Sequence, residues 1–323
     1  MVDPSPGAGS SRDLVLVGVP IDCVGAPAPD HALFGTELSP AALRAAGVGP
    51  ALAGEDGGDL AVRLTGRDRD PATGVLGWPA VVEVTDAVRG RVRDLVAGGR
   101  LPVVLGGCCS LLPGALAGAR DALGPLRGSL GLAYLDGHLD LYDGRTSPTG
   151  EPADMPVAVV SGLGPPGWAA LVDAPVVAAD RLVLLGPRDR DEAASLGSAL
   201  PEQLGIAAEL TPADLRALGP DEAGRRTRDR LAASGGRYWV HLDVDVLDEV
   251  EFPATDYLMP GGLTLAELAG VLTPLTRSSA LAGFSLGCYN PQKDDGGRGA
   301  RALVGLLAQA LAAEQPARPD SGG

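Results

Sequence analysis

The stretch that decides the fold is residues 238–264, which read YWVHLDVDVLDEVEFPATDYLMPGGLT. Its apolar start, Tyr238 to Leu242, predicts a buried strand, and three carboxylates, Asp243, Asp245 and Asp248, follow at once. Because residues two apart in a strand point to the same side, we expect the carboxylates of Asp243 and Asp245 to face one spot. Two like charges so close raise each other's pKa unless a cation lies between them. Hard oxygen ligands favour Mg²⁺, Mn²⁺ or a similar ion, and the alternative is a solvated acidic turn.

A second cluster of ligand-type side chains favours the metal site over the turn. The apolar residues 130–135 predict another strand, and Asp136, His138 and Asp140 follow it at alternate positions. Carboxylates and a neutral imidazole can bind one ion together. A third predicted strand, residues 101–105, leads into GGCCS at 106–110. Ligand sites in open parallel sheets gather at the carboxyl ends of strands, so we expect these ends to form one site.

The rest of the chain alternates between strand and helix signals. Further strands are predicted at 14–19, 181–185 and 280–286, and helices at 39–46, 80–97, 220–234, 264–272 and 299–311. This alternation predicts an α/β fold with a mostly parallel central sheet covered by helices on both faces. Residues 13–313 are expected to form a single domain. The tails at 1–12 and 314–323 are rich in Pro, Gly and Ser and are expected to be flexible.

The composition excludes several classes of partner. The chain of 323 residues has a net charge of −15 and no block of basic residues, which argues against nucleic acid and membrane surfaces. Its four cysteines are too few for a disulfide scaffold. The start lacks the basic region and apolar run of a signal peptide. We therefore expect a cytoplasmic protein, and its acidity is compatible with a cationic small-molecule substrate.

These motifs resemble the ureohydrolase family, which contains arginase, agmatinase, formiminoglutamase and guanidinobutyrase. The family's motifs GGDHS, DAHxD and SxDxDxxDP stand here, in the same order, as GGCCS at 106–110, DGHLD at 136–140 and HLDVDVLDE at 241–249. The similarity continues through GGLT at 261–264 to YNP at 289–291. It covers most of the chain and implies the family's three-layer α/β/α fold.

The resemblance also implies a metal site. In the family, two Mn²⁺ ions share a hydroxide that attacks a guanidinium or amidine carbon, and the metals lower the pKa of that water. By motif, Asp136 and Asp243 would bridge the metals, and His138 and Asp245 would complete the ligands of one ion. Asp140 would bind the other ion and accept a hydrogen bond from the hydroxide. Family members commonly form trimers or hexamers, so a homo-oligomer is expected by resemblance.

The GGCCS motif departs from the family at its metal ligand. Cys109 stands where the family has a histidine ligand, and a thiolate suits Zn²⁺ or Fe²⁺ better than Mn²⁺. Three outcomes are open: Cys109 ligates, it leaves one strong and one weak metal, or it is an inert buried thiol. Cys108 replaces the motif's Asp, which removes a supporting carboxylate. One or two ions are therefore expected.

The residues expected to contact the substrate also depart from the family's pattern. Cys288 replaces a Glu that pairs with the guanidinium, and Ala153 in TGEPAD replaces a catalytic His. The proton donor for the leaving amine would then be Asp154, Glu151 or the more distant Asp256, each of which could instead be a solvated surface acid. Tyr142 and Tyr257 occupy positions that bind the amino-acid end of the substrate in arginase. These changes argue against a plain arginase.

The resulting prediction is a metal-dependent hydrolase of a linear C–N bond in a guanidino, hydroxyguanidino, amidine or formimino compound. One alternative is a catalytically silent relative that serves as a binding protein or subunit. Another is an amidohydrolase of the deacetylase kind acting on an acetylated amine. His31 is expected on the surface. His241 is expected behind the ligands, and the alternative is that it is itself a ligand. Asp248 is expected to have a structural role.

Overall fold

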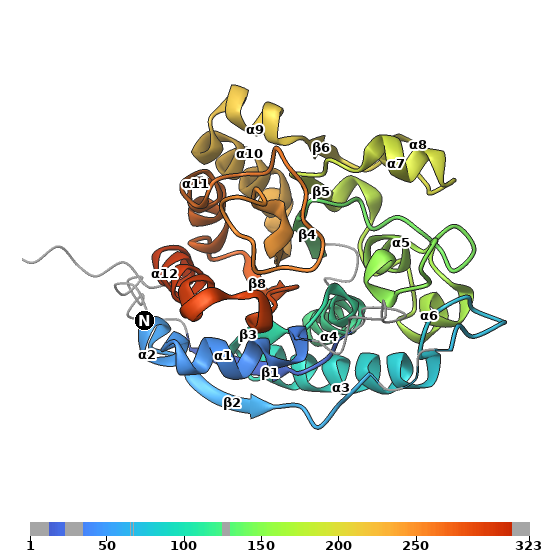
Figure 1. Cartoon of the computed structure of the whole chain (residues 1–323), viewed down its shortest axis with the longest axis horizontal. Coiled ribbons are helices and arrows are strands. Elements are labelled where there is room, and N and C mark those ends of the chain that lie inside the picture. The colour runs from blue at the N-terminus through green and yellow to red at the C-terminus, as the bar shows by residue number, and fades with distance from the viewer. Residues whose placement is uncertain (1–12, 23–34, 65, 67, 125–129, 312–323) are drawn as a thin grey trace, which may run out of the picture.

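The protein is built on one eight-stranded sheet in which every described strand pair is parallel. The computed structural model describes residues 13–22, 35–64, 66, 68–124 and 130–311 (Figure 1). The strands follow the order β2-β1-β3-β8-β7-β4-β5-β6 across the sheet. Their bounds are β1 Leu14–Val19, β2 Glu55–Asp59, β3 Leu101–Gly106, β4 Leu130–Leu135, β5 Leu182–Leu185, β6 Ala208–Leu210, β7 Arg237–Asp243 and β8 Leu281–Gly287.

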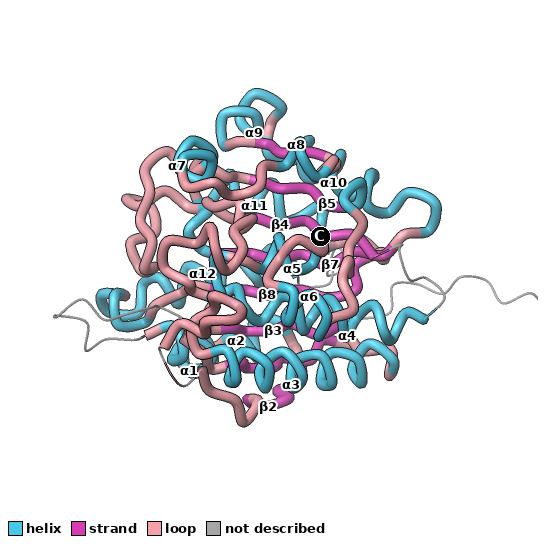
Figure 2. The backbone as a smooth tube through the Cα atoms, turned by 90° about the vertical axis from the view of Figure 1, so that its right-hand side faces the viewer, coloured by secondary structure: helices cyan, strands magenta, loops and turns pink. Residues whose placement is uncertain are grey.

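Helices cover both faces of the sheet, so the predicted three-layer α/β/α fold is confirmed. Figure 2 shows the strands as a ladder, from β2 at the bottom to β5 near the top, between the helices. The helices are α1 Ser39–Ala45, α2 Val48–Leu52, α3 Trp78–Ala97, α4 Leu112–Leu123, α5 Pro156–Ser161, α6 Pro166–Leu171, α7 Arg190–Ser195, α8 Pro201–Leu204, α9 Pro212–Leu218, α10 Pro220–Ala232, α11 Leu265–Thr276 and α12 Arg298–Leu311.

The core lies in two layers, one on each side of the sheet. Along β4, Ala133 and Leu135 pack into the cluster that contains α10, α11 and α12, whereas Leu132 and Tyr134 pack into the cluster of α3, α4 and α5. The central strands are apolar on both faces because both faces are covered, which is why they read as continuous hydrophobic runs. Among the described residues, no helix combines the length and apolarity that a membrane-spanning segment needs.

The strand order creates a crevice at the centre of the sheet. Strands β3 and β4 are consecutive in the chain, but β8 and β7 lie between them. Such a change of direction in strand order opens a crevice beyond the carboxyl ends of the strands. The ends of β3, β8, β7 and β4 are therefore neighbours there, although the residues they carry are up to 179 positions apart.

Candidate metal centre and active site

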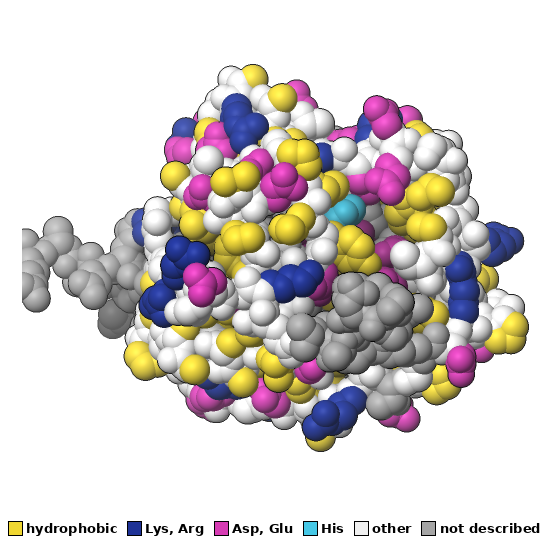
Figure 3. All heavy atoms as spheres, viewed as in Figure 1, with side chains coloured by type: hydrophobic (Ala, Val, Ile, Leu, Met, Phe, Trp, Pro, Cys, Tyr) yellow, Lys and Arg dark blue, Asp and Glu magenta, His cyan; other side chains and the backbone are white. Residues whose placement is uncertain are grey.

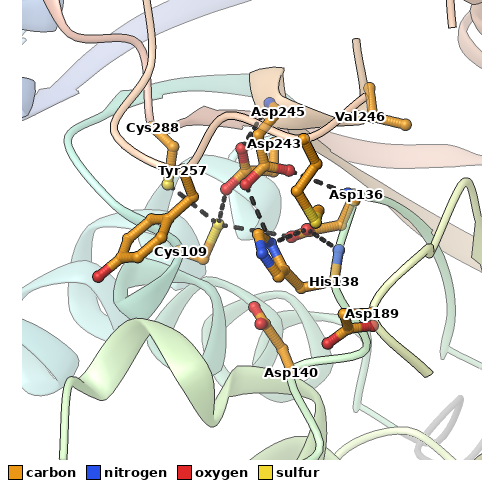
Figure 4. A network of polar contacts seen from close by, with 12 residues as sticks. Cys109, Asp136, His138, Asp140, Asp189, Asp243, Asp245, Val246, Tyr257 and Cys288 are labelled. Atoms are coloured by element: carbon orange, nitrogen blue, oxygen red, sulfur yellow. Dashed lines mark hydrogen bonds and ion pairs between the residues drawn. The ribbon is translucent and has the colours of Figure 1, made fainter. Parts of the chain in front are cut away.

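The crevice holds all six predicted metal ligands. Figure 4 shows Cys109 after β3, Asp136 and His138 after β4, Asp243 at the end of β7 and Asp245 just beyond it, directed toward one another. Three overlapping groups have ligand atoms within 4.8 Å of one another, and each could hold an ion. They are Asp136 with His138 and Asp245, Cys109 with Asp136 and Asp140, and Cys109 with Asp243 and Cys288.

The first group combines two carboxylates with an imidazole. His138 Nδ1 lies 3.0 Å from Asp245 Oδ2 and 3.3 Å from Asp136 Oδ1. Burial works to lower the pKa of His138, but the two carboxylates outweigh it and hold that pKa well above its usual value. The His138 side chain is 26% exposed, so it lies at the boundary between the buried carboxylates and the open side of the crevice.

Cys109 lies at the centre of the other two groups. Its Sγ is 2.8 Å from Asp243 Oδ2, 3.9 Å from Asp136 Oδ2 and 3.7 Å from Cys288 Sγ. Asp140 joins from the loop after β4, where its backbone adopts a φ of +49° and Tyr134 Oη donates a hydrogen bond to its carboxylate. The Cys109 thiol is therefore directed at the carboxylates and does not lie apart from them in the core.

The charge of this cluster fits a divalent cation. Asp136, Asp140, Asp243 and Asp245 are each at most 7% exposed. Burial, together with repulsion from Asp245, raises the pKa of Asp136 well above its usual value and that of Asp243 to about 7. His138 can balance the charge of at most one of these four buried carboxylates, so the cluster is costly in a dry site unless a cation offsets the rest. Oxygen, nitrogen and sulfur donors are all available to such an ion.

Asp243 and Asp245 bring their carboxylates into one crevice, as expected, but the premise that they share one face of a strand is wrong. Strand β7 ends at Asp243, and Asp245 belongs to a short 3₁₀ turn, η7 (Val244–Val246). The turn rotates the second carboxylate, so Asp243 faces Cys109 while Asp245 faces His138. The backbone N–H of Asp245 donates to Asp243 Oδ1 at 2.9 Å, which fixes the two residues relative to each other.

A cavity of about 570 Å³ opens above these ligands. Figure 3 shows the hollow on this face, with acidic side chains and a histidine in it. No lysine or arginine is among the described residues that line the cavity, whereas nine carboxylates are: Asp136, Asp140, Glu151, Asp154, Asp189, Glu192, Asp243, Asp245 and Asp256. The cavity is therefore strongly electronegative.

Two of the candidate proton donors, Glu151 and Asp154, lie on the segment between β4 and α5 that lines the cavity, and the third, Asp256, lies between β7 and α11. Asp154 Oδ2 accepts hydrogen bonds from Ser147 Oγ at 2.5 Å and Thr149 Oγ1 at 2.7 Å, and burial raises its pKa. Glu151 Oε2 accepts from Tyr257 Oη at 2.6 Å. Asp256 also lines the cavity, but it pairs with Lys293 at 2.7 Å and accepts from Asn290. Lys293 therefore offsets the charge of Asp256, which leaves Asp154 and Glu151 as the better candidates for the proton donor.

The remaining predicted residues fall outside the ligand set or outside the described chain. His241 is fully buried and lies 3.0 Å from Cys109 Sγ, behind the ligands. Asp248 accepts from the N–H groups of Val250 and Gly261 and so has the structural role expected of it. His31 lies outside the described residues. Tyr142 and Tyr257 both line the cavity.

Sequence reasoning missed two residues that follow β5. Arg188 lies behind the ligands, and its Nη2 donates to the carbonyl of Asp245 at 2.7 Å. Asp189 Oδ1 accepts from Leu139 N at 3.0 Å, while its Oδ2 is buried and has no hydrogen-bond partner in the described part of the chain. The signal that indicates the predicted ligands also applies to these two residues, because GPRD at 186–189 directly follows an apolar strand.

Known proteins are similar to this chain along most of its length. The model of the arginase family matches residues 12–313. The arginase of Staphylococcus aureus strain MRSA252 is 28% identical over 296 residues, which cover 89% of this chain and 95% of that protein. The arginase of Agrobacterium fabrum is 29% identical over 305 residues, with 90% and 88% covered. The solved arginase of Bacillus caldovelox superimposes with a TM-score of 0.80 at 25% identity, covering 94% of this chain and 99% of that one.

Proposed function

Because this chain belongs to the arginase family and is a ureohydrolase-type hydrolase of guanidino or amidino C–N bonds, we propose that its substrate is cationic and carries no free carboxylate. The supporting observation is the electronegative cavity above the ligands, which has no lysine or arginine among its described lining residues. Beyond the ligand cluster, every charged side chain among the described lining residues is a carboxylate, so a substrate carboxylate would be repelled there, at a cost that rises as water is excluded. A free amino acid such as arginine is therefore disfavoured.

The metal ligands in this proposal are Cys109, Asp136, His138, Asp140, Asp243 and Asp245. They would hold one or two divalent ions, Mn²⁺ at the oxygen-rich positions and Zn²⁺ or Fe²⁺ where the thiol contributes. An ion bound there supplies Lewis acidity, which lowers the pKa of water to near neutrality.

In this proposal, buried carboxylates of the chain accept and donate the protons of the reaction. Asp140 is fixed by Tyr134 and is placed to accept a proton from the attacking water. Asp154 lies on the cavity wall and, with its raised pKa, can pass a proton to the leaving amine. A proton carrier works best when its pKa approaches the working pH. Glu151, tied to Tyr257, would shape the wall or share this task.

The cavity lining also offers carboxylates for a second positive group. Asp189 Oδ2 is buried without a hydrogen-bond partner among the described residues, and Glu192 lines the cavity as well. A buried acceptor of this kind is satisfied when a ligand donates to it. Guanidino or amidino compounds that also carry an amine, including hydroxyguanidino ones, therefore fit the cavity better than formimino acids.

A substrate panel tests this proposal. Purified protein loaded with Mn²⁺ or Zn²⁺ is expected to release urea or ammonia from guanidino and amidino amines, and not from matched compounds that carry a carboxylate. Asp154→Asn should lower kcat about 100-fold or more, as is usual for loss of a proton-transfer group, with unchanged metal content. Faster turnover of the carboxylate compounds, or no product from any of them, would overturn the proposal.

Two further expectations belong to the proposal. A homo-oligomer, a trimer or hexamer, should appear in light scattering as a particle whose mass is that multiple of 32.5 kDa. A cytoplasmic location should appear in cell fractionation, and a protein found only in the membrane or culture-medium fraction would contradict it.

A further inference from the structure

Two cysteines face each other on the floor of the cavity. Cys109 Sγ and Cys288 Sγ are 3.7 Å apart, and both residues are free cysteines. A disulfide bond measures about 2.0 Å, so the two sulfurs are neighbours that are not bonded. Figure 4 shows the Cys109 sulfur beside Asp243, with the Cys288 sulfur on the outer side of the cluster. The pair therefore adds soft donors to one end of the acidic cluster.

The backbone holds this pair in place from two strands. Cys109 begins the 3₁₀ turn η2 (Cys109–Leu111) after β3, and Cys288 directly follows β8. The N–H of Cys288 donates to the carbonyl of Gly107 at 2.6 Å, which links the two strand ends. Cys288 adopts a φ of +64°, a conformation that costs free energy for a non-glycine residue and is concentrated at functional sites. A Cβ at Gly287 would come within 3.3 Å of Cys109 Sγ, so this glycine permits the close approach.

Asp243 completes a set of three donors with the two sulfurs. Cys109 Sγ lies 2.8 Å from Asp243 Oδ2, and the donor atoms of all three residues lie within 4.8 Å of one another. With zinc–sulfur bonds of about 2.3 Å, tetrahedral geometry separates two sulfur ligands by about 3.8 Å. The observed sulfur separation of 3.7 Å already matches this value. An ion would take the place of the proton between Cys109 and Asp243.

We propose that Cys109, Cys288 and Asp243 form a thiolate site for Zn²⁺ or another thiophilic ion, next to the oxygen and imidazole site of Asp136, His138 and Asp245. Thiolate ligands select zinc over manganese, whereas carboxylates suit manganese. The centre would therefore bind two different metals, one at each end. His241 Nε2, 3.0 Å from Cys109 Sγ, orients the sulfur from behind. The inference rests on the metal centre of the proposed function, and it adds Cys288 as a ligand.

Cobalt spectroscopy of the full chain tests this site without any measurement of turnover. Reduced protein stripped of metal with a chelator is titrated with Co²⁺, and a thiolate-to-cobalt charge-transfer band is expected in the near ultraviolet. Zn²⁺ should remove the band, whereas Mn²⁺ at the same concentration should leave it. If the unmodified protein binds cobalt without this band, or if Mn²⁺ removes the band as readily as Zn²⁺ does, the proposal is overturned.

Matched variants separate the two ends of the centre. Cys288→Ser should keep about half of the band, since one of two thiolates remains, and should weaken Zn²⁺ binding by at least the 10- to 100-fold seen when supporting residues are lost. Asp245→Asn, at the other end, should keep the full band. A full band in Cys288→Ser contradicts the proposal. If the band is absent but urea or ammonia is released, this inference fails and the proposed function stands. If the band is present but no product is released, the proposed function fails and this inference stands.

Discussion

At the scale of single residues, the sulfur of Cys109 is held by a line of buried polar contacts. Trp239 Nε1 donates to Ser285 Oγ at 2.8 Å, and Ser285 Oγ lies 2.7 Å from His241 Nδ1. The other ring nitrogen of His241 lies 3.0 Å from Cys109 Sγ. Burial lowers the pKa of His241 to about 3, so the imidazole is neutral and contributes a hydrogen bond without a charge. Residues on β7 and β8 thus position a thiol that follows β3.

Replacing Ser285 tests this line of contacts. Ser285→Ala leaves the Trp239 N–H and His241 Nδ1 without their partner in a fully buried place. Each unsatisfied group costs about 1–3 kcal/mol, so we expect a loss of about 2 kcal/mol or more in the free energy of unfolding, measured with urea. Ser195→Ala, at an exposed serine of α7, should change stability by less than about 0.5 kcal/mol. Equal effects of the two substitutions would show that the contacts do not matter.

At the scale of elements, one arginine secures the loop that carries Asp245. The guanidinium of Arg188 donates to the carbonyls of Asp245, Val246 and Leu247 at 2.7–3.4 Å, and to that of Met259 at 3.4 Å. Residues 244–247 follow β7, and within the described ranges their strand-like pairing is limited to the bridge of Leu247 to Leu263. The planar fork of Arg188 supplies those missing contacts and so sets the position of the Asp245 carboxylate.

Arg188→Lys is therefore expected to weaken metal binding, although the hydrogen bonds of Arg188 in the described part of the chain go to backbone carbonyls and not to the proposed ligand atoms. Lysine keeps the charge but cannot span several carbonyls, so Asp245 would lose its fixed position. Loss of such a supporting residue typically lowers metal affinity about 10- to 100-fold, which calorimetric titration with Mn²⁺ would measure. Arg190→Lys is the control, because Arg190 pairs with Glu202 and Glu209 away from the ligands. An unchanged Mn²⁺ affinity in Arg188→Lys would show that Arg188 does not position Asp245 for metal binding.

At the scale of the whole molecule, the central strands were predictable and the edges were not. Six strands were predicted because their buried runs are continuously apolar, as in LVLVGV of β1. Strand β2 reads EDGGD and is largely exposed, and β6 is three residues long, so neither has an apolar signal. Edge strands pair on one side only and need no hydrophobic face. Strands β2 and β6 form through backbone pairing at the two edges of the sheet, and hydrophobic sequence patterns do not indicate such pairing.

The site was predictable as far as strand ends could be recognised. Cys109, Asp136, His138 and Asp243 follow apolar strands, and the structure brings them together. For Cys288, the sequence pattern indicates only the loss of a substrate contact. Its position beside Cys109 depends on the pairing of β3 with β8, across a separation of 179 residues. Hydrophobic periodicity carries no information about which strands pair at that distance.

The overall charge of the molecule predicts how binding depends on salt. With a net charge of −15 and an electronegative cavity, the protein should attract a cationic substrate over long distances. The Debye length falls from about 30 Å at 0.01 M to about 8 Å at 0.15 M ionic strength. We therefore expect KM to rise several-fold over this range while kcat changes little, in steady-state assays at constant metal content. A KM that is independent of salt would contradict the assignment of a cationic substrate.

We expect separate strand ends to bring their carboxylates, imidazole and thiols to shared cations. Anomalous diffraction from crystals grown with Mn²⁺, recorded at the manganese absorption edge, would locate such an ion. We expect a manganese peak enclosed by Asp136, His138 and Asp245, which a chelator removes. Well-ordered crystals with no peak among these side chains, or with manganese bound only elsewhere, would contradict it.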